Sequence, residues 1–288
     1  MGQWLTLGML LSLSLFQSGS SLASRFDQIA QKAQGRVGAA VMLIENGDCA
    51  GIRMEEKFPM ASVFKLPVGM AVLHRIDQGR LALDRKVLVK KSDFVAAGNY
   101  SAVRDRYPEG NAEISVRELL RLMMVVSDGT ACDVLLRLAG GPASVTEYLK
   151  SLGVNELVVA VSQKEMSVSR ESQNRNWATP TGAVQLLRTL HQSPSISRSS
   201  RSLLLQFMAE CETGPQRIRG LLPQGTVVSH KTGSLGAQAT NDVGIVTLPD
   251  GRKLAVAVFV SDSRAGETAR ERVIAEIARA AWDHYLGK

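Results

Sequence analysis

Cysteine and histidine are scarce in this chain of 288 residues, and neither is arranged for metal binding. The three cysteines are an odd number without C-x-x-C spacing, and the four histidines are scattered along the chain. A disulfide framework and a zinc site are therefore not indicated, and no metal or other cofactor is expected. The residues concerned are Cys49, Cys132, Cys211, His74, His191, His230 and His284.

Charged side chains are missing from residues 1–23, which carry the apolar run Leu5 to Phe16. Small residues follow, and Ser21-Leu22-Ala23 fits a small-x-small cleavage site. The pattern is typical of a signal peptide over 1–23, with Ser24 as the mature N terminus, although the usual basic residue near the start is absent. The apolar run is short for a membrane span of about 20 residues. We therefore expect export, to the periplasm or the medium, with no membrane attachment after the leader is removed.

Clusters of one charge sign are also lacking. The chain has 34 lysines and arginines against 27 acidic residues, for a net charge of +7. Because basic and acidic residues are interleaved, this pattern indicates a solvated basic surface and does not favour nucleic-acid binding. A positive surface is compatible with small anionic substrates.

Hydrophobic patterning predicts strands at both ends of the chain and helices between them. This order favours an α+β fold in which an antiparallel sheet is assembled from both chain ends and an all-helical domain is inserted. The expected sheet domain comprises residues 24–54 and 211–288, and the helical domain residues 55–210. Strands are expected at 37–45, through Ile52, and at 227–232, 242–248 and 253–261; helices are expected at 24–34, 62–79, 115–126, 131–138, 143–152, 181–192, 200–210 and 267–286.

Three short motifs carry the chemistry of the sequence. Ser62 lies where a helix is expected to start, and Lys65 lies one turn later on the same face. A serine hydroxyl needs a neighbouring group to take its proton, and a lysine in an apolar helix can do so because burial lowers its pKa. Downstream follow Ser127-Asp128-Gly129 and Lys231-Thr232-Gly233, in this order. Each motif alone has a structural explanation, a helix cap or a surface charge, but their joint occurrence favours a catalytic site.

Together these motifs resemble the serine penicillin-recognising enzymes, and most closely the class A β-lactamases. The resemblance covers essentially the whole mature chain and includes Phe58-Pro59-Met60 and Val116-Arg117-Glu118-Leu119. It implies a β-lactamase/D,D-peptidase-like fold, with a five-stranded antiparallel sheet flanked by helices and an all-helical domain. It also implies a serine hydrolase of the α/β (α+β) class that hydrolyses the cyclic amide bond of small β-lactam molecules and acts as a monomer.

The resemblance assigns roles to the motif residues. Ser62 would be the acylated nucleophile, and Lys65 would accept its proton directly or through water. Ser127 would relay a proton to the departing lactam nitrogen, with the charge of Lys231 nearby. Further resemblance implies substrate-binding roles for Tyr100, Gly129, Arg217, Thr232, Gly233 and Ser234, the last contributing a backbone N–H to the oxyanion hole together with that of Ser62.

Two features depart from the class A pattern. Gly129 replaces an asparagine whose amide would hold the acylamino group of the substrate, although some class A enzymes share this glycine. The loop 161–180 is shorter, and its E-x-x-L-N pattern is imperfect. Glu165 is the expected base for hydrolysis of the acyl-enzyme, with Glu171 as the alternative, and either residue can also be explained as a solvated acid.

Three activities therefore remain open from the sequence. The first is a β-lactamase that completes its cycle with Glu165. The second is a D,D-peptidase-like penicillin-binding enzyme, because such enzymes share the three motifs and lack that glutamate. The third is a sensor domain that β-lactams acylate without release. The flanking sequence and the small size favour the first.

Overall fold

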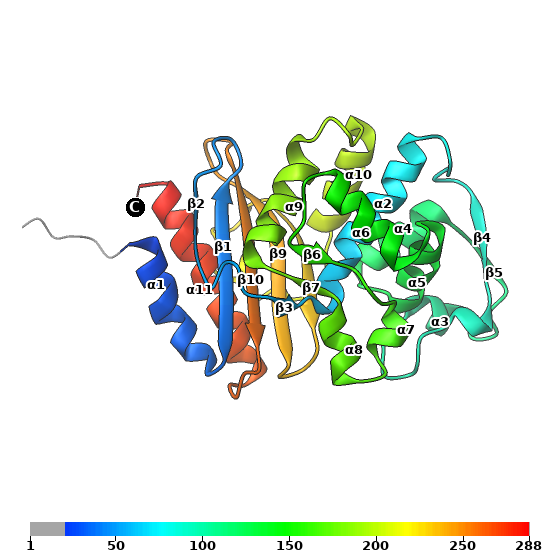
Figure 1. Ribbon diagram of the computed structural model, residues 1–288, viewed down its shortest axis with the longest axis horizontal. Helices are drawn as coiled ribbons and strands as arrows, with labels where there is room; N and C mark the ends of the chain where they lie inside the picture. Colours follow the sequence, from blue (N-terminus) through cyan, green and yellow to red (C-terminus); the bar gives the residue numbers. More distant parts are fainter. Residues whose placement is uncertain (1–20, 288) are drawn as a thin grey trace, which may run out of the picture.

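A five-stranded antiparallel sheet forms the centre of the molecule in a computed structural model that describes residues 21–287 (Figure 1). The strand order is β2-β1-β10-β9-β8. Two of these strands precede all the large helices and three follow nearly all of them, so the chain ends meet in one sheet. The strands are β1 (Arg36–Leu43), β2 (Cys49–Ile52), β8 (Val228–Ser234), β9 (Ala239–Thr247) and β10 (Lys253–Ser261).

Each face of the sheet is covered by a different set of helices. One face packs against α1 (Leu22–Ala30) and α11 (Glu267–Tyr285), which come from opposite ends of the chain. The other face packs against α9 (Pro180–Gln192) and shares a continuous hydrophobic core with the helical part of the molecule. Figure 1 shows the sheet standing between these two layers. The sheet domain and the helical part therefore meet over a buried, apolar junction.

The helical part lies between β2 and β8 in the sequence. Its main helices are α2 (Lys65–Asp77), α4 (Val116–Val125), α5 (Gly129–Leu138), α6 (Gly141–Ser151), α9 and α10 (Arg198–Ala209). Shorter segments connect them: α3 (Ala102–Arg106), α7 (Gln163–Met166), α8 (Arg170–Arg175) and the 3₁₀ turns η2 (Ala61–Phe64) and η3 (Lys91–Asp93). The turns η1 (Gln31–Ala33) and η4 (Ile218–Leu221) lie outside this part, after α1 and before β8.

The fold class and the assembly of the sheet from both chain ends are confirmed. The sequence did not predict two small sheets, one pairing β4 (Lys86–Val89) with β5 (Ala112–Ser115) and one with the order β3-β7-β6. The second consists of β3 (Phe58–Pro59), β6 (Leu157–Val158) and β7 (Trp177–Ala178). These strands have two to four residues, too few for a period of two to stand out, and their pairing is nonlocal. The segment 161–180 was expected to be irregular but contains α7 and α8.

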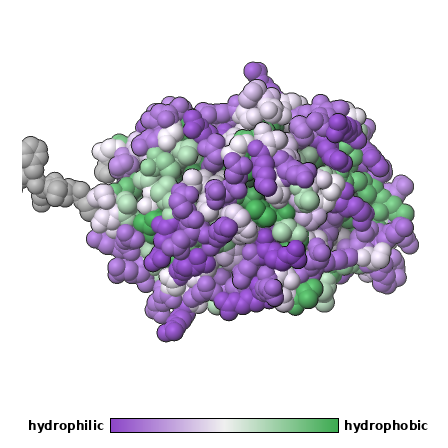
Figure 2. All heavy atoms as spheres, viewed as in Figure 1, coloured by the Kyte–Doolittle hydropathy of each residue, from purple (hydrophilic) through white to green (hydrophobic). Residues whose placement is uncertain are grey.

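The predicted signal peptide falls almost entirely on residues 1–20, outside the described residues. Of its last residues, Ser21 caps α1 by accepting a hydrogen bond from the Ser24 N–H, and Leu22 is buried against the sheet. None of the helices over residues 21–287 has the length and apolar character needed to cross a membrane. Figure 2 shows a surface dominated by polar residues, with apolar residues in small patches.

Candidate active site

The site begins at the turn that carries Ser62. Ser62 lies in η2, which runs directly into α2, and Lys65 is the first residue of that helix. Ala61 just before it has φ of +48°, a left-handed conformation that L-residues adopt at some cost in energy. The segment entering the turn is held by the Asn241 side chain of β9, whose Nδ2 donates to the carbonyls of Pro59 at 2.8 Å and Met60 at 3.2 Å. The strained turn is therefore anchored to the sheet.

Lys65 is buried, with 2% of its surface exposed. Its Nζ donates to the backbone oxygen of Ser127 at 2.5 Å and to the Ser127 Oγ at 3.2 Å. Burial lowers the pKa of this amine, although the charge of Asp128 partly opposes the shift. A lowered pKa increases the neutral fraction, which is the form that can accept a proton from a serine.

Ser127 connects α4 to α5 and has φ of +60°. The following Asp128 fixes this conformation because it is fully buried and its carboxylate accepts from the N–H groups of Val103 at 2.9 Å and Ala131 at 2.8 Å. Ser127 Oγ also accepts from Lys231 Nζ at 3.0 Å. Its hydroxyl thus lies between two lysine amines, 3.2 Å from one and 3.0 Å from the other.

Lys231 reaches the site from β8, the strand at the edge of the sheet. It is fully buried, and this burial lowers its pKa to about 8. Its Nζ also donates to the Thr232 carbonyl at 3.1 Å. Since β8 pairs only with β9 within the described sheet, its outer edge has backbone groups available to a ligand.

Gly233 allows β8 to approach the serine turn closely. A Cβ at this position would lie 2.5 Å from the Met60 carbonyl oxygen and 3.1 Å from the Ser62 nitrogen. Any larger residue would push the strand away from Ser62. The sequence predicted a substrate-binding role for Gly233, which stays a prediction, and did not predict this packing against the serine turn. The neighbouring Thr232 hydroxyl is hydrogen-bonded to the Thr213 hydroxyl at 2.5 Å.

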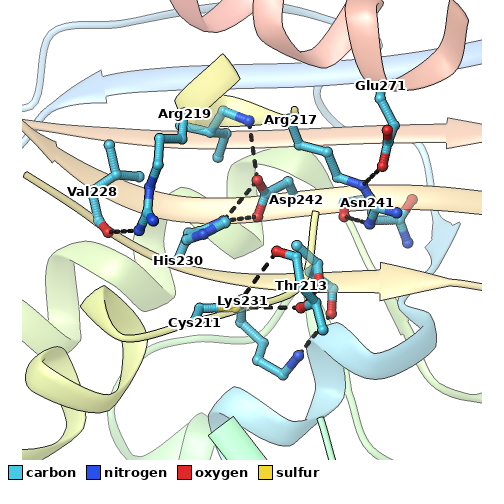
Figure 3. Close-up of polar contacts among 12 residues, drawn as sticks. Cys211, Thr213, Arg217, Arg219, Val228, His230, Lys231, Asn241, Asp242 and Glu271 are labelled. Carbon is cyan, nitrogen blue, oxygen red and sulfur yellow. Dashed lines mark hydrogen bonds and ion pairs between the residues drawn. The ribbon is translucent and has the colours of Figure 1, made fainter. Parts of the chain in front are cut away.

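Arg217 lies beneath this strand end with only 3% of its surface exposed. Its guanidinium pairs with Glu271 at 3.0 Å, donates to the carbonyls of Gly233 at 3.2 Å and Asn241 at 2.9 Å, and donates to Ser234 Oγ at 2.7 Å. Figure 3 shows this buried network beside Lys231. Most of its donors are engaged by the protein, so Arg217 orients Ser234 and adds a positive charge behind it.

His230 and Asp242 form a second buried contact, between β8 and β9. The His230 Nδ1 lies 2.9 Å from the Asp242 carboxylate, and Figure 3 shows both side chains next to Lys231. This contact joins the two neighbouring strands inside the protein. The three cysteines are free thiols, and residues 21–287 contain no group of three His, Cys, Asp or Glu side chains that could hold a metal ion.

Glu165 and Glu171 do not point into this site. Glu165 is exposed, and its carboxylate accepts from the Ser162 N–H at 2.8 Å while the Ser162 hydroxyl accepts from the Glu165 N–H at 3.2 Å. This capping box starts α7, and the bond from the Ser162 backbone lowers the pKa of the carboxyl. Glu171 is exposed in the first turn of α8. The prediction that either is the base stays a prediction, and the position of both side chains speaks against it.

One polar side chain of this loop that turns inward is Gln163, which sequence reasoning missed. It is 6% exposed and packs against Gly129. The signal that could have found it is the Ser162-x-x-Glu165 spacing, because a capping box already gives Glu165 a structural role. Tyr100 is 56% exposed, and its backbone carbonyl accepts from the Gly129 N–H at 3.0 Å. A cavity of about 480 Å³ connects this region to the end of β8; its lining includes Asn99, Gln163, Gln173, Ser234 and Gly236.

Comparison with known proteins identifies the family. Residues 21–285 match the model of the β-lactamase enzyme family. The chain is 38% identical to the extended-spectrum β-lactamase PER-1 of Pseudomonas aeruginosa, over 97% of this chain and 93% of the relative. It is 32% identical to β-lactamase VEB-1 of the same organism, over 93% of this chain and 91% of that one.

Solved structures agree. A β-lactamase from Chitinophaga pinensis superimposes with a TM-score of 0.87 at 42% identity, covering 91% of this chain and 98% of that chain. The TLA-1 extended-spectrum β-lactamase superimposes with a TM-score of 0.89 at 39% identity, covering 93% and 99%. The chain therefore belongs to the β-lactamase enzyme family and is a class A serine β-lactamase, a hydrolase acting on β-lactams. Of the three activities left open by the motifs, β-lactamase activity is confirmed, whereas the use of Glu165 as the base stays a prediction.

Proposed function

We propose that this β-lactamase works through an acyl-enzyme formed on Ser62. Lys65 and Ser127 transfer the protons, and the charge of Lys231 stabilises negative charge on Ser127. The observation that carries the proposal is the position of the Ser127 hydroxyl, between Lys65 Nζ at 3.2 Å and Lys231 Nζ at 3.0 Å. Such an arrangement suits a proton relay, because the hydroxyl can donate its proton to a leaving group and be reprotonated by a neighbouring ammonium.

Acylation follows from these contacts. Neutral Lys65, its pKa lowered by burial, takes the proton of Ser62 as Oγ attacks the lactam carbonyl carbon. The lactam C–N bond breaks, and the nitrogen receives the proton of Ser127. The charge of Lys231 next to the Ser127 Oγ favours the transient alkoxide character of that oxygen.

Substrate binding is assigned to the free edge of β8. The carboxylate of the β-lactam is bound by the Lys231 ammonium and the hydroxyls of Thr232 and Ser234, with the charge of Arg217 behind them. The backbone N–H groups of Ser62 and Ser234 form the oxyanion hole. The close packing of Gly233 against the serine turn supports this assignment, because it brings the strand edge to the Ser62 nitrogen. Tyr100 and Gly129 would border the acylamino side.

The same proposal covers the cell biology of the enzyme. Residues 1–23 would act as a signal peptide, and the mature enzyme would work as a soluble monomer in the periplasm or outside the cell. The uncharged apolar stretch Leu5 to Phe16 and the small residues after it support this interpretation.

Replacing the nucleophile tests the mechanism. Ser62→Ala is expected to lower kcat for benzylpenicillin by at least about 10³-fold, because no acyl-enzyme can form. Intact-protein mass spectrometry of quenched reactions should find a penicilloyl adduct on the wild type and none on the variant. Ser195→Ala removes an exposed serine hydroxyl in the loop between α9 and α10, away from the site, and is the matched control that should keep the adduct. Turnover that survives in Ser62→Ala would contradict the proposal.

A further inference from the structure

Gln163 is the buried polar side chain of loop 161–180 with an unused hydrogen-bonding atom. Its Nε2 donates to Asn99 Oδ1 at 3.2 Å, but its Oε1 is buried and has no partner among residues 21–287. A buried carbonyl oxygen without a hydrogen bond costs about 1–3 kcal/mol, so such an atom is expected to meet water or a ligand. The fully buried amide of Asn176, in the same loop, uses its Oδ1 to accept from two backbone N–H groups.

Gln163 packs against the start of α5, directly after Ser127 and Asp128. A Cβ on Gly129 would lie only 3.1 Å from Gln163 Cγ, and Gly129 is two residues from Ser127. Gln163 also lines the cavity of about 480 Å³ that reaches Ser234 at the end of β8. Its amide therefore lies between the loop that carries Ser127 and the strand edge assigned to the substrate.

The backbone of Gln163 is held firmly from α5. Asp133 accepts from the Gln163 N–H at 2.6 Å through one oxygen and from the Lys164 N–H at 3.0 Å through the other. The capping box between Ser162 and Glu165 fixes the same turn. These bonds turn Gln163 inward and Glu165 outward, so the two residues cannot exchange positions without breaking the first turn of α7.

We propose that Gln163 is the loop residue that binds the hydrolytic water at the Ser62 ester, and that hydrolysis of this ester limits turnover. The inference rests on the acyl-enzyme of the proposed function. In deacylation the water oxygen bonds to the ester carbonyl carbon, the bond from that carbon to Ser62 Oγ breaks, and Oγ takes up a proton. The water must give its proton to a base. A carboxamide oxygen accepts a hydrogen bond from water but does not take its proton near neutral pH.

The water therefore gives its proton to the Lys65 amine, which can pass it to Ser62 Oγ. A carboxylate at position 163 would add a general base directly at the water, and such help is typically worth about 10²–10⁴-fold. Gln163→Glu should therefore convert an enzyme that accumulates its acyl intermediate into one that does not.

The test is a rapid-quench time course with benzylpenicillin, following product and the adduct on Ser62 by intact mass. The wild type should show a burst of one equivalent followed by slower turnover with the adduct accumulated. Gln163→Glu should keep the acylation rate, raise deacylation by about 10²–10⁴-fold and leave little adduct at steady state. Gln173→Glu makes the same chemical change elsewhere on the cavity wall and should behave as the wild type.

The outcomes separate the two proposals. Absence of an adduct on Ser62, with turnover intact in Ser62→Ala, would overturn the proposed function itself. An adduct that forms but does not accumulate in the wild type, or loss of deacylation in Glu165→Gln, would overturn only the role of Gln163. If Gln163→Glu fails a thermal-unfolding check, Gln163→Ala replaces it and should slow deacylation about tenfold further through loss of the bound water; an unchanged rate would overturn the inference.

Discussion

Two buried lysines donate to one hydroxyl, Ser127 Oγ, and the lowered pKa has a different consequence for each. Lys65 gains a larger neutral fraction, which suits a proton acceptor at the nucleophile. Lys231, with a pKa lowered to about 8, still carries its charge at neutral pH. The cationic form can bind a substrate carboxylate and favour charge on Ser127. In the proposed mechanism, lysine therefore serves both as a base and as a cation in the same site.

The pH profile should show this division. Lysine is cationic below its pKa, so kcat/KM for benzylpenicillin should fall above about pH 8 as Lys231 loses its charge. KM should rise because carboxylate binding weakens, and kcat should fall because Ser127 loses the neighbouring charge. Lys65 acts in the opposite sense, because it must be neutral to accept a proton, so its loss of charge should raise kcat/KM with pH. Initial rates across the stable pH range measure both limbs. The methyl ester of benzylpenicillin lacks the carboxylate and is the control substrate. A falling limb of the same size with the ester would contradict the role of Lys231.

The residues of the three motifs were predictable, and the loop residue was not, for a physical reason. Serine and lysine at helical spacing, and a lysine on a strand that ends in glycine, carry their chemistry in a few neighbouring positions. The orientation of Gln163 depends on Asp133, which lies 30 residues away in the sequence and binds the backbone of α7. No local pattern contains that contact. The capping-box spacing of Ser162 and Glu165 shows only that Glu165 has a structural role, so the two glutamates of the loop were predicted as bases.

At the scale of elements, the site depends on the edge strand β8. Its inner side pairs with β9, and its end is tied down by Arg217, which contacts Gly233, Ser234 and β9 at the same time. The sequence predicted strands here and a positive charge at Arg217 but not its burial, because the Glu271 partner comes from α11 on the other side of the sheet. Pairing across such distances also explains why β4 and β5 were missed.

Arg217→Met should destabilise the protein and weaken substrate binding. Removing the guanidinium leaves the Glu271 carboxylate and two carbonyl groups without their donor. Breaking a buried ion pair costs about 3–5 kcal/mol of stability. We expect a loss of about 3 kcal/mol in the free energy of unfolding because Glu271 is partly exposed. Chemical denaturation measures the free energy of unfolding, and steady-state kinetics should show a raised KM. Arg272→Met removes an exposed helical pair with Glu276 and should cost less than about 0.5 kcal/mol. Equal losses in both variants would argue against the buried network.

At the scale of the whole molecule, each face of the sheet packs against its own hydrophobic core, and the two cores have different roles. The core under α1 and α11 contains Phe26 and has no contact with the serine turn. The core on the other face contains Phe58, which stacks on Phe259 at 5.8 Å and precedes the turn by a few residues. Both Phe26 and Phe58 are fully buried, so they form a matched pair for separating stability from activity.

Phe26→Ala and Phe58→Ala should each cost about 3–5 kcal/mol, the usual range for removing a buried aromatic side chain. At a temperature where both variants are folded, Phe26→Ala should keep the wild-type kcat/KM, and Phe58→Ala should lose activity because the turn before Ser62 loses its support. Thermal unfolding and benzylpenicillin kinetics measure the two effects. Equal loss of activity in both variants would show that the cores are not independent.

The meeting of the chain ends in one sheet has a consequence for the order in which the enzyme is made. A ribosome produces Ser62 and Lys65 well before β8 (Val228–Ser234), the strand that approaches the Ser62 nitrogen. In the proposed mechanism, a nascent chain that ends before β8 therefore has its nucleophile without the strand that binds substrate and completes the oxyanion hole. Covalent labelling of Ser62 by a penicillin would accordingly report that β8 has been made and has joined the sheet.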